Sequence, residues 1–284
     1  MKLITFLALI GFMVLTSCAD EGTTSSALLT FSFKLDNQQV RLDNFGRPST
    51  IPQGHGAQSP RFQSISAHYI ELVPTPITPL GNGEVLYLNS ETTAGGEKAI
   101  DFGKSIIAAE GEEFLSIPVN DIAPGTYEYI RVSLAYQNYD IDVLASGTTI
   151  AGTIASFVGY NTFISQFKVK DAQVTINGNK KQGYWAFESP IGVIQGQAPA
   201  GATTVPNPLA STSPIPIGSC VVTGKFSEPL VISSNQAQNI GITLSLSINN
   251  SFEWIEVTPD NKFEPLAGEA VIDMGLRGLI PIVK

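Results

Sequence analysis

The sequence has few of the side chains on which most enzymes and metal proteins depend. Its 284 residues include two histidines and two cysteines, and neither histidine lies in an HExxH zinc motif. The chain contains no GxSxG nucleophile elbow, no Walker loop and no GxGxxG fingerprint. These absences exclude the commonest signatures of hydrolases and nucleotide-binding enzymes, although an enzyme that works with carboxylates would escape this test.

Charged side chains are also scarce, at 14% of the residues, where a typical soluble domain has about a quarter. Without residues 1–17 the chain keeps 15 basic and 25 acidic side chains, because Lys2 is the one charge removed, and its net charge is −10. An acidic chain without basic clusters argues against nucleic acid and anionic lipid as partners. No cofactor motif is present, and we expect no cofactor.

Long apolar runs are missing except at the start, where Leu3 to Val14 follows the positive charge of Lys2. That run is too short for a membrane-spanning helix, which needs about 20 residues, and has the length of a secretory signal. The next four residues, Leu15-Thr16-Ser17-Cys18, resemble the lipobox of bacterial lipoproteins. The resemblance implies that Cys18 is acylated and begins the mature chain; the alternative is an ordinary signal peptide with an incidental cysteine.

The residues after Cys18 predict where the protein is held. Asp20 and Glu21 resemble the short acidic surface-export signals of Bacteroidota lipoproteins, or else they belong to a solvated tether. Two or three acyl chains on Cys18 would anchor the protein stably. We therefore expect a signal peptide at 1–17, a tether at 18–27, and a domain at 28–284 anchored to the outer membrane, with surface exposure if the export signal holds.

Period-two alternation of apolar and polar residues predicts about ten short strands in that domain, beginning with LLTFSFKL. With 26 glycines and 18 prolines in turns, this pattern predicts an all-β antiparallel sandwich, Ig-like or jelly-roll-like, with long loops. Two lobes divided near residues 146–152 are an alternative to a single one. The uncharged stretch from Ser189 to Gly224 contains many prolines, and we expect a long loop there.

The ionisable residues give weak signals. His68 alternates with its strand and His55 lies in a glycine-flanked loop, so we expect a structural and a solvated role respectively. Cys220, which has no partner if Cys18 is acylated, is interpreted as a buried apolar residue. Asp140 and Asp142 share a strand face but lack the further oxygen ligands that Ca²⁺ requires.

Aromatic side chains provide the candidate binding site. Trp185 and Phe187 share a strand face, Tyr136 and Tyr139 lie beside the aspartates, and Trp254 lies on a later strand. Exposed rings of these types would form platforms for sugars or contacts for proteins, and core packing is the alternative. Since Trp185 precedes the uncharged stretch, we expect ring and loop to meet at one end of the sandwich.

The segment PGTYEYIRVSL, Pro124 to Leu134, resembles sandwich domains of Bacteroidota lipoproteins, among them copper-binding lipoproteins associated with methanobactin systems. Phe31 and Phe33 stand in the opening strand where those copper proteins are rich in histidine, so no ligand residue is carried over. The sequence therefore predicts a lipid-anchored, non-enzymatic binding protein for an envelope polysaccharide, protein or other ligand. The alternatives are a copper-binding lipoprotein and an envelope hydrolase that uses carboxylates.

Overall fold

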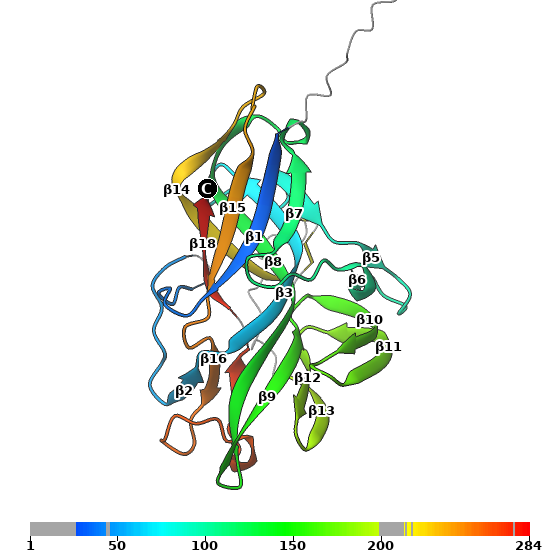
Figure 1. Cartoon of the computed structure of the whole chain (residues 1–284), viewed down its shortest axis with the longest axis vertical. Helices are drawn as coiled ribbons and strands as arrows, with labels where there is room; N and C mark the ends of the chain where they lie inside the picture. Colours follow the sequence, from blue (N-terminus) through cyan, green and yellow to red (C-terminus); the bar gives the residue numbers. More distant parts are fainter. Residues whose placement is uncertain (1–26, 44–45, 199–212, 214, 217, 275) are drawn as a thin grey trace, which may run out of the picture.

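The alternating pattern forms strands over most of the chain in the computed structural model, which describes residues 27–43, 46–198, 213, 215–216, 218–274 and 276–284. The all-β sandwich is confirmed, with strands that pair mainly antiparallel and two parallel pairs, β1 with β15 and β6 with β10 (Figure 1). Within the described ranges, no helix is long and apolar enough to span a membrane.

The elements, in chain order, are β1 (Leu28–Asp36), β2 (His55–Gln58), β3 (Arg61–Val73), β4 (Glu84–Leu88), β5 (Glu91–Thr92), β6 (Ala99–Asp101), the 3-10 turn η1 (Phe102–Lys104), β7 (Glu113–Pro118), η2 (Val119–Asp121), β8 (Gly125–Ala145), β9 (Thr148–Phe157), β10 (Asn161–Lys168), β11 (Gln173–Lys181), β12 (Tyr184–Ser189), β13 (Gly192–Gln197), β14 (Cys220–Ile232), β15 (Ile240–Ser247), β16 (Phe252–Ile255), η4 (Pro265–Ala267), β17 (Val271–Asp273) and β18 (Arg277–Val283).

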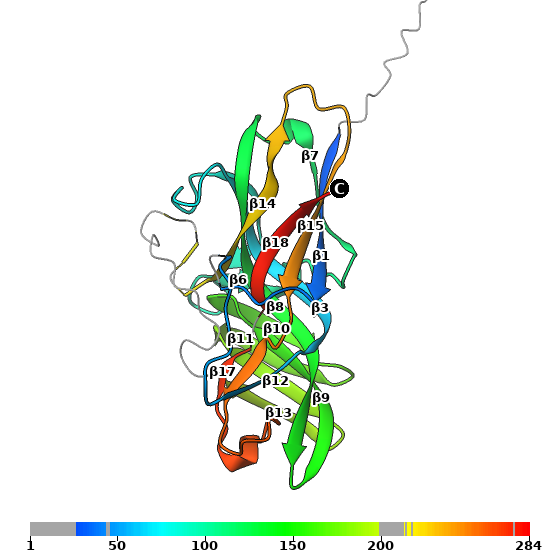
Figure 2. The same cartoon turned by 90° about the vertical axis from the view of Figure 1, so that its left-hand side faces the viewer.

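The upper lobe is a sandwich of two sheets. Its first sheet has the order β18-β15-β1-β7, and it packs on β14, β4 and the adjoining halves of β3 and β8 (Figures 1 and 2). The inward residues of β1, Leu29, Phe31 and Phe33, are at most 1% exposed and lie in this core. The predicted opening strand thus supplies the centre of the upper core.

The lower lobe has three layers. Its middle layer consists of β13, β12, β9 and the second half of β8. One face of that layer packs against the sheet β11-β10-β6-β5, and the other faces the small sheet β17-β16-β2. Apolar residues therefore fill both faces of β9 and β12.

Two long strands join the lobes, because β3 and β8 run through both of them. The first half of β8 pairs with β14 and the second half with β9, while β3 pairs with β8 along its length. Residues 146–152, which the sequence suggested as a division, form the β8–β9 hairpin turn and the start of β9. Ser146 and Gly147 both have positive φ, as a two-residue hairpin turn of the I′ type requires.

Candidate functional site

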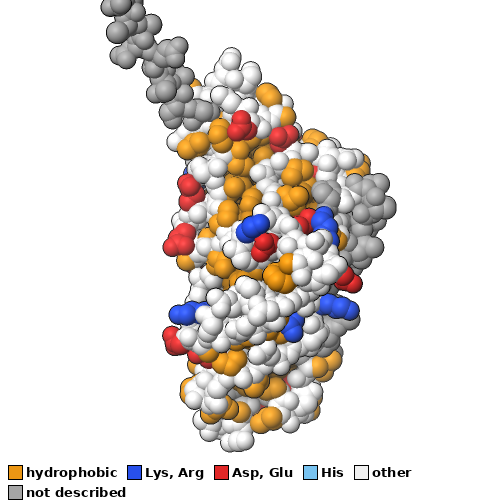
Figure 3. Space-filling view, turned by 90° about the vertical axis from the view of Figure 1, so that its right-hand side faces the viewer, with side chains coloured by type: hydrophobic (Ala, Val, Ile, Leu, Met, Phe, Trp, Pro, Cys, Tyr) orange, Lys and Arg blue, Asp and Glu red, His pale blue; other side chains and the backbone are white. Residues whose placement is uncertain are grey.

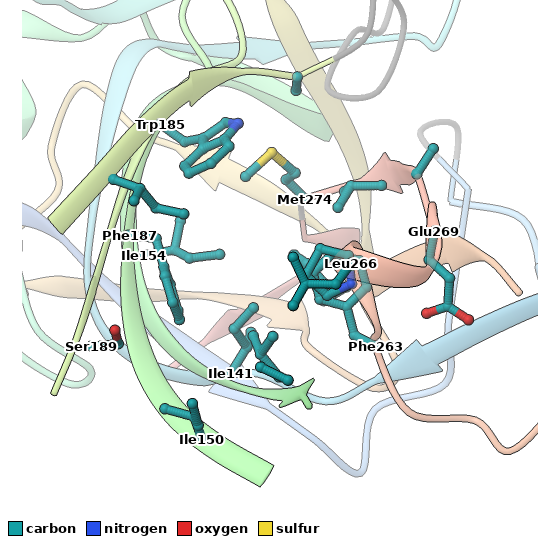
Figure 4. A pocket seen from close by; sticks show the side chains of 18 of the residues that line it. Ile141, Ile150, Ile154, Trp185, Phe187, Ser189, Phe263, Leu266, Glu269 and Met274 are labelled. Carbon is teal, nitrogen blue, oxygen red and sulfur yellow. The ribbon is translucent and has the colours of Figure 1, made fainter. Parts of the chain in front are cut away.

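An apolar cavity of about 400 Å³ lies in the lower lobe, on the face of the middle layer that looks toward β16 and β17 (Figure 4). We call it the apolar pocket. It is lined by Ile141, Val143, Ala145, Ile150, Ile154, Trp185, Phe187, Ser189, Ile191, Ile194, Gln197, Ala198, Phe252, Phe263, Pro265, Leu266, Glu269, Ala270, Val271 and Met274. Its volume and composition are typical of small-molecule sites, which measure about 300–1,000 Å³ and are mostly apolar.

Strand alternation builds the wall formed by the middle layer. Residues two apart on a strand point to the same face, so Trp185 and Phe187 on β12 both face the apolar pocket. Their neighbours Tyr184 and Ala186 point to the opposite face and are buried there. The prediction that the two rings share a face is confirmed, and both are partly buried rather than sealed in the core.

Two glycines in the same wall make room for these rings. Gly196 on β13 pairs directly with Trp185, and a Cβ at this glycine would lie 2.4 Å from the indole. A Cβ at Gly152 on β9 would lie 2.2 Å from the ring of Phe187. Since real Cβ atoms do not approach so closely, any side chain at either position would push a ring toward the cavity. The glycines therefore set how far the rings protrude into the apolar pocket.

The opposite wall comes from Phe263, Leu266 and Met274, and Figure 4 shows Trp185 and Phe187 facing them across the cavity. Glu269 holds the loop that carries this wall. One of its carboxylate oxygens accepts from the backbone N–H groups of Val257 and Thr258, at 3.1 and 3.3 Å, and the other from that of Glu264 at 2.6 Å.

These hydrogen bonds decide the electrostatics of the apolar pocket. Glu269 is 5% exposed, and Figure 4 shows its carboxylate turned away from the cavity. Backbone donors thus engage both of its oxygens, while no lysine or arginine is among the lining residues that the structure describes. The lining consequently offers no positive charge to a ligand. Its one negative charge, that of Glu269, is already hydrogen-bonded to backbone N–H groups of the loop.

The aromatic site predicted from the sequence divides into two groups. Trp254 and Tyr139 are 0% exposed and Tyr136 is 4% exposed, so these three rings are not surface platforms. Trp254 and Tyr139 belong to the core beside the apolar pocket, and Tyr136 packs on the opposite face of the middle layer. The prediction of an exposed site is wrong for these three residues. The sheets β17-β16-β2 and β11-β10-β6-β5 cover the faces of β8 on which Tyr139 and Tyr136 lie, and Trp254, on β16, packs inward against Phe252 and Phe263.

The ionisable candidates have local partners. The Nδ1 atom of His55 lies 2.6 Å from the carboxylate of Glu253, which also pairs with Arg41 and Arg277, so His55 is part of a charge cluster rather than a solvated loop. His68 is fully buried, as expected for a structural role. In the described part of the chain, no group of three or more histidine, cysteine, aspartate or glutamate side chains is placed to hold a metal ion.

Cys220 and the aspartates of β8 also have structural surroundings. Cys220 packs against the upper core, and burial raises the pKa of its thiol to about 12, so it stays protonated. Asp142 pairs with Arg61 at 2.9 Å, and Asp140 accepts a hydrogen bond from Thr153 at 2.5 Å. Each carboxylate therefore has its own partner.

Two predicted features fall largely on residues that the structure does not describe. Cys18 lies outside the described residues, and so does most of the proline-rich part of the uncharged stretch. The beginning of that stretch is not a loop, since β13 occupies Gly192–Gln197, and its end is the start of β14.

The sequence did not predict five of the pocket residues: Ile191, Ile194, Phe263, Leu266 and Met274. Their apolar character in turn-rich segments was the available signal.

No protein-family model matches the sequence, and neither a curated protein nor a solved structure matches the chain. The geometry and chemistry of the apolar pocket are therefore the features that bear on function.

Proposed function

We propose that this chain is a non-enzymatic binding protein of the bacterial outer membrane, anchored by lipid on Cys18, and that the apolar pocket receives its ligand. The observation that carries the proposal is a cavity of about 400 Å³ whose lining is almost entirely apolar and includes Trp185 and Phe187. A cavity of this kind gains binding energy from burying apolar ligand surface, at roughly 25 cal/mol per Å².

The chemistry of the apolar pocket supports binding over the two alternatives. Catalysis by carboxylates needs acidic groups facing the substrate, whereas the one carboxylate in the lining is hydrogen-bonded to backbone amides. A copper site needs converging imidazole or sulfur ligands, and the lining has one thioether, that of Met274.

The position of the apolar pocket suits an anchored binding protein. β1 begins at one pole of the molecule, at the end of the upper lobe, whereas the apolar pocket lies in the lower lobe (Figures 1 and 2). Sixteen residues of β8 separate Gly125, the first residue of this strand, from Ile141 in the lining, a distance of about 50 Å in an extended strand. A domain standing on its N-terminal tether would direct the apolar pocket away from the membrane.

The anchor is tested with Cys18→Ala. This change should abolish incorporation of labelled palmitate and move the protein from the membrane fraction to the soluble fraction. Persistent labelling, or membrane attachment that survives the change, would contradict the lipid anchor without bearing on the pocket.

The ligand site is tested with an uncharged dye whose fluorescence rises in apolar surroundings, added to the full-length Cys18→Ala protein. Ile194→Glu places a charge at the pocket and should lower the dye's affinity at least tenfold. Val231→Glu is the matched control, because Ile194 and Val231 are 59% and 58% exposed and only the former lines the pocket. Equal dye affinities in the two variants would refute the pocket as the binding site.

A further inference from the structure

We propose that the apolar pocket selects ligands by charge, and that its ligand is an uncharged, single hydrocarbon chain rather than a sugar or an anionic amphiphile. This inference rests on the proposed function, because it names the class of ligand for the same pocket. Three features of the lining carry it: its charges, its hydrogen-bonding groups, and its size and rim.

The charges disfavour an anion. The described lining contains no lysine or arginine, and its one ionisable group is the carboxylate of Glu269. Outside the lining, the buried Arg41 and the partly buried Arg277 are paired with the carboxylate of Glu253, which is 3% exposed. A ligand carboxylate or phosphate inside the apolar pocket would lose water, find no cation, and lie near the negative charge of Glu269.

The hydrogen-bonding groups disfavour a sugar. Apart from Glu269, the lining side chains with hydrogen-bonding groups are Ser189, Gln197 and the indole N–H of Trp185, and Gln197 already donates to the backbone oxygen of Gln182 at 2.6 Å. A saccharide has hydroxyl groups around its whole ring, and burying them without partners is unfavourable. The rings of Trp185 and Phe187 can pack on a sugar, but the facing wall of Phe263, Leu266 and Met274 cannot hydrogen-bond through its side chains to the opposite side.

The size and the rim favour one chain. A cavity of about 400 Å³ is near the lower end of the range for small-molecule sites, which suits a single chain better than a lipid with several chains. The rim continues the apolar surface outward, since Ile191, Ile194 and Leu266 are 86%, 59% and 78% exposed. Such a rim can cover a chain that extends beyond the cavity. On the face of the molecule that Figure 3 shows, charged side chains lie singly or in small groups and form no dense charged patch.

The test is competition against the uncharged dye in the full-length Cys18→Ala protein. The competitors are a long-chain primary alcohol, the carboxylate of the same chain length, and a linear oligosaccharide, with the alcohol and the carboxylate kept at concentrations too low for self-association. The alcohol should displace the dye at a concentration at least tenfold lower than the carboxylate, and the oligosaccharide should not displace it. Equal or better displacement by the carboxylate, or displacement by the oligosaccharide, would overturn the inference.

A pair of equally exposed isoleucines provides the control. Ile191 at the rim and Ile77 in the upper lobe are both 86% exposed, so Ile191→Glu and Ile77→Glu should leave the unfolding midpoint unchanged. Only Ile191→Glu should weaken displacement of the dye by the alcohol. An equal effect of both changes would refute the role of the rim in binding the hydrocarbon chain. The two levels of the proposal fail separately: the proposed function fails if the dye binds independently of Ile194, whereas only the charge selection fails if the dye binds there but carboxylate and alcohol compete equally.

Discussion

The two faces of β12 differ in how far their side chains are exposed. Tyr184 and Ala186 look toward the sheet β11-β10-β6-β5 and are 4% and 0% exposed. Trp185 and Phe187 look the other way and remain partly exposed at the apolar pocket. Residue type does not account for the difference, because large aromatic residues occur on both faces.

The coverage of each face accounts for it. On the first face, which we call the closed face, the ring of Phe157 lies 5.0 Å from that of Phe167, 5.0 Å from that of Phe102 and 5.7 Å from that of Tyr184. These rings pack on one another between the two sheets. On the second, open face, the small sheet and the loop that carries Phe263 and Leu266 meet the strands across a cavity. The proposed binding site thus lies where the covering layer leaves a cavity.

The largest effect should separate the closed face from the open face. Phe157→Ala removes a fully buried ring from the closed face and should lower the free energy of unfolding by about 3–5 kcal/mol. Phe187→Ala should cost about 1–2 kcal/mol, because this ring is partly exposed beside a cavity, but should weaken dye binding strongly. Denaturant unfolding and dye titration of both variants measure the two effects; equal losses of stability would remove the distinction.

The next effect concerns the loop that covers the open face. Glu269→Ala leaves three backbone N–H groups without their acceptor and should lower the free energy of unfolding by about 2–3 kcal/mol. Dye affinity should fall as well, since the wall of Phe263 and Leu266 loses its support. Glu228→Ala, at an exposed position on β14, is the control and should change neither quantity. Dye binding that survives in Glu269→Ala would show that the loop does not shape the pocket.

The sheet β11-β10-β6-β5, which covers the closed face, should make the stability of the fold sensitive to acid. Burial alone would raise the pKa of Glu91 on β5, but the close approach of His68, the ion pair with Lys98 and the hydrogen bond from Tyr160 lower it to about 2. A depressed carboxyl pKa stabilises the fold above the ordinary value of 4.5, and this contribution is lost as the pH falls toward 2.

That loss should amount to about 2 kcal/mol between pH 4.5 and pH 2. Glu91→Gln should be less stable at neutral pH and should show a flatter decline over this window, which unfolding curves at several pH values measure. A variant whose stability falls as steeply as that of the parent protein would indicate that other carboxyl groups control the acid response.

The smallest effect tests the glycines of the open face. Gly196→Ala forces the indole of Trp185 to move and should cost about 1 kcal/mol of stability while lowering dye affinity several-fold. Gly178→Ala on β11 is the matched control, because a Cβ there would meet no atom within 4 Å. The fluorescence spectrum of the tryptophans should change in the first variant and not in the second. Unchanged affinity in Gly196→Ala would mean that the position of the ring is not critical.

The comparison also shows what the sequence could predict. Alternation predicted the strand of LLTFSFKL and the common face of Trp185 and Phe187, because both depend on a local period. It did not separate these rings from Tyr139 and Trp254, whose burial depends on contacts with strands far away in the chain. The facing wall was missed for the same reason: Phe263 and Leu266 lie in a turn-rich segment, and only the folded chain brings them opposite β12.

The pairing of β1 has a consequence for how the chain is made. β1 lies between β7 and β15, and its parallel partner β15 begins more than 200 residues later, with Leu29 opposite Ile240. Synthesis proceeds from the N-terminus, so Leu29, Phe31 and Phe33 are made long before the strand that completes their sheet. Until then they form an apolar segment with a free strand edge, the kind of segment that aggregates. We expect newly made chains to depend on a holding chaperone until residues 240–247 have been synthesised, whereas the β8–β9 hairpin, with its two-residue turn, can form at once.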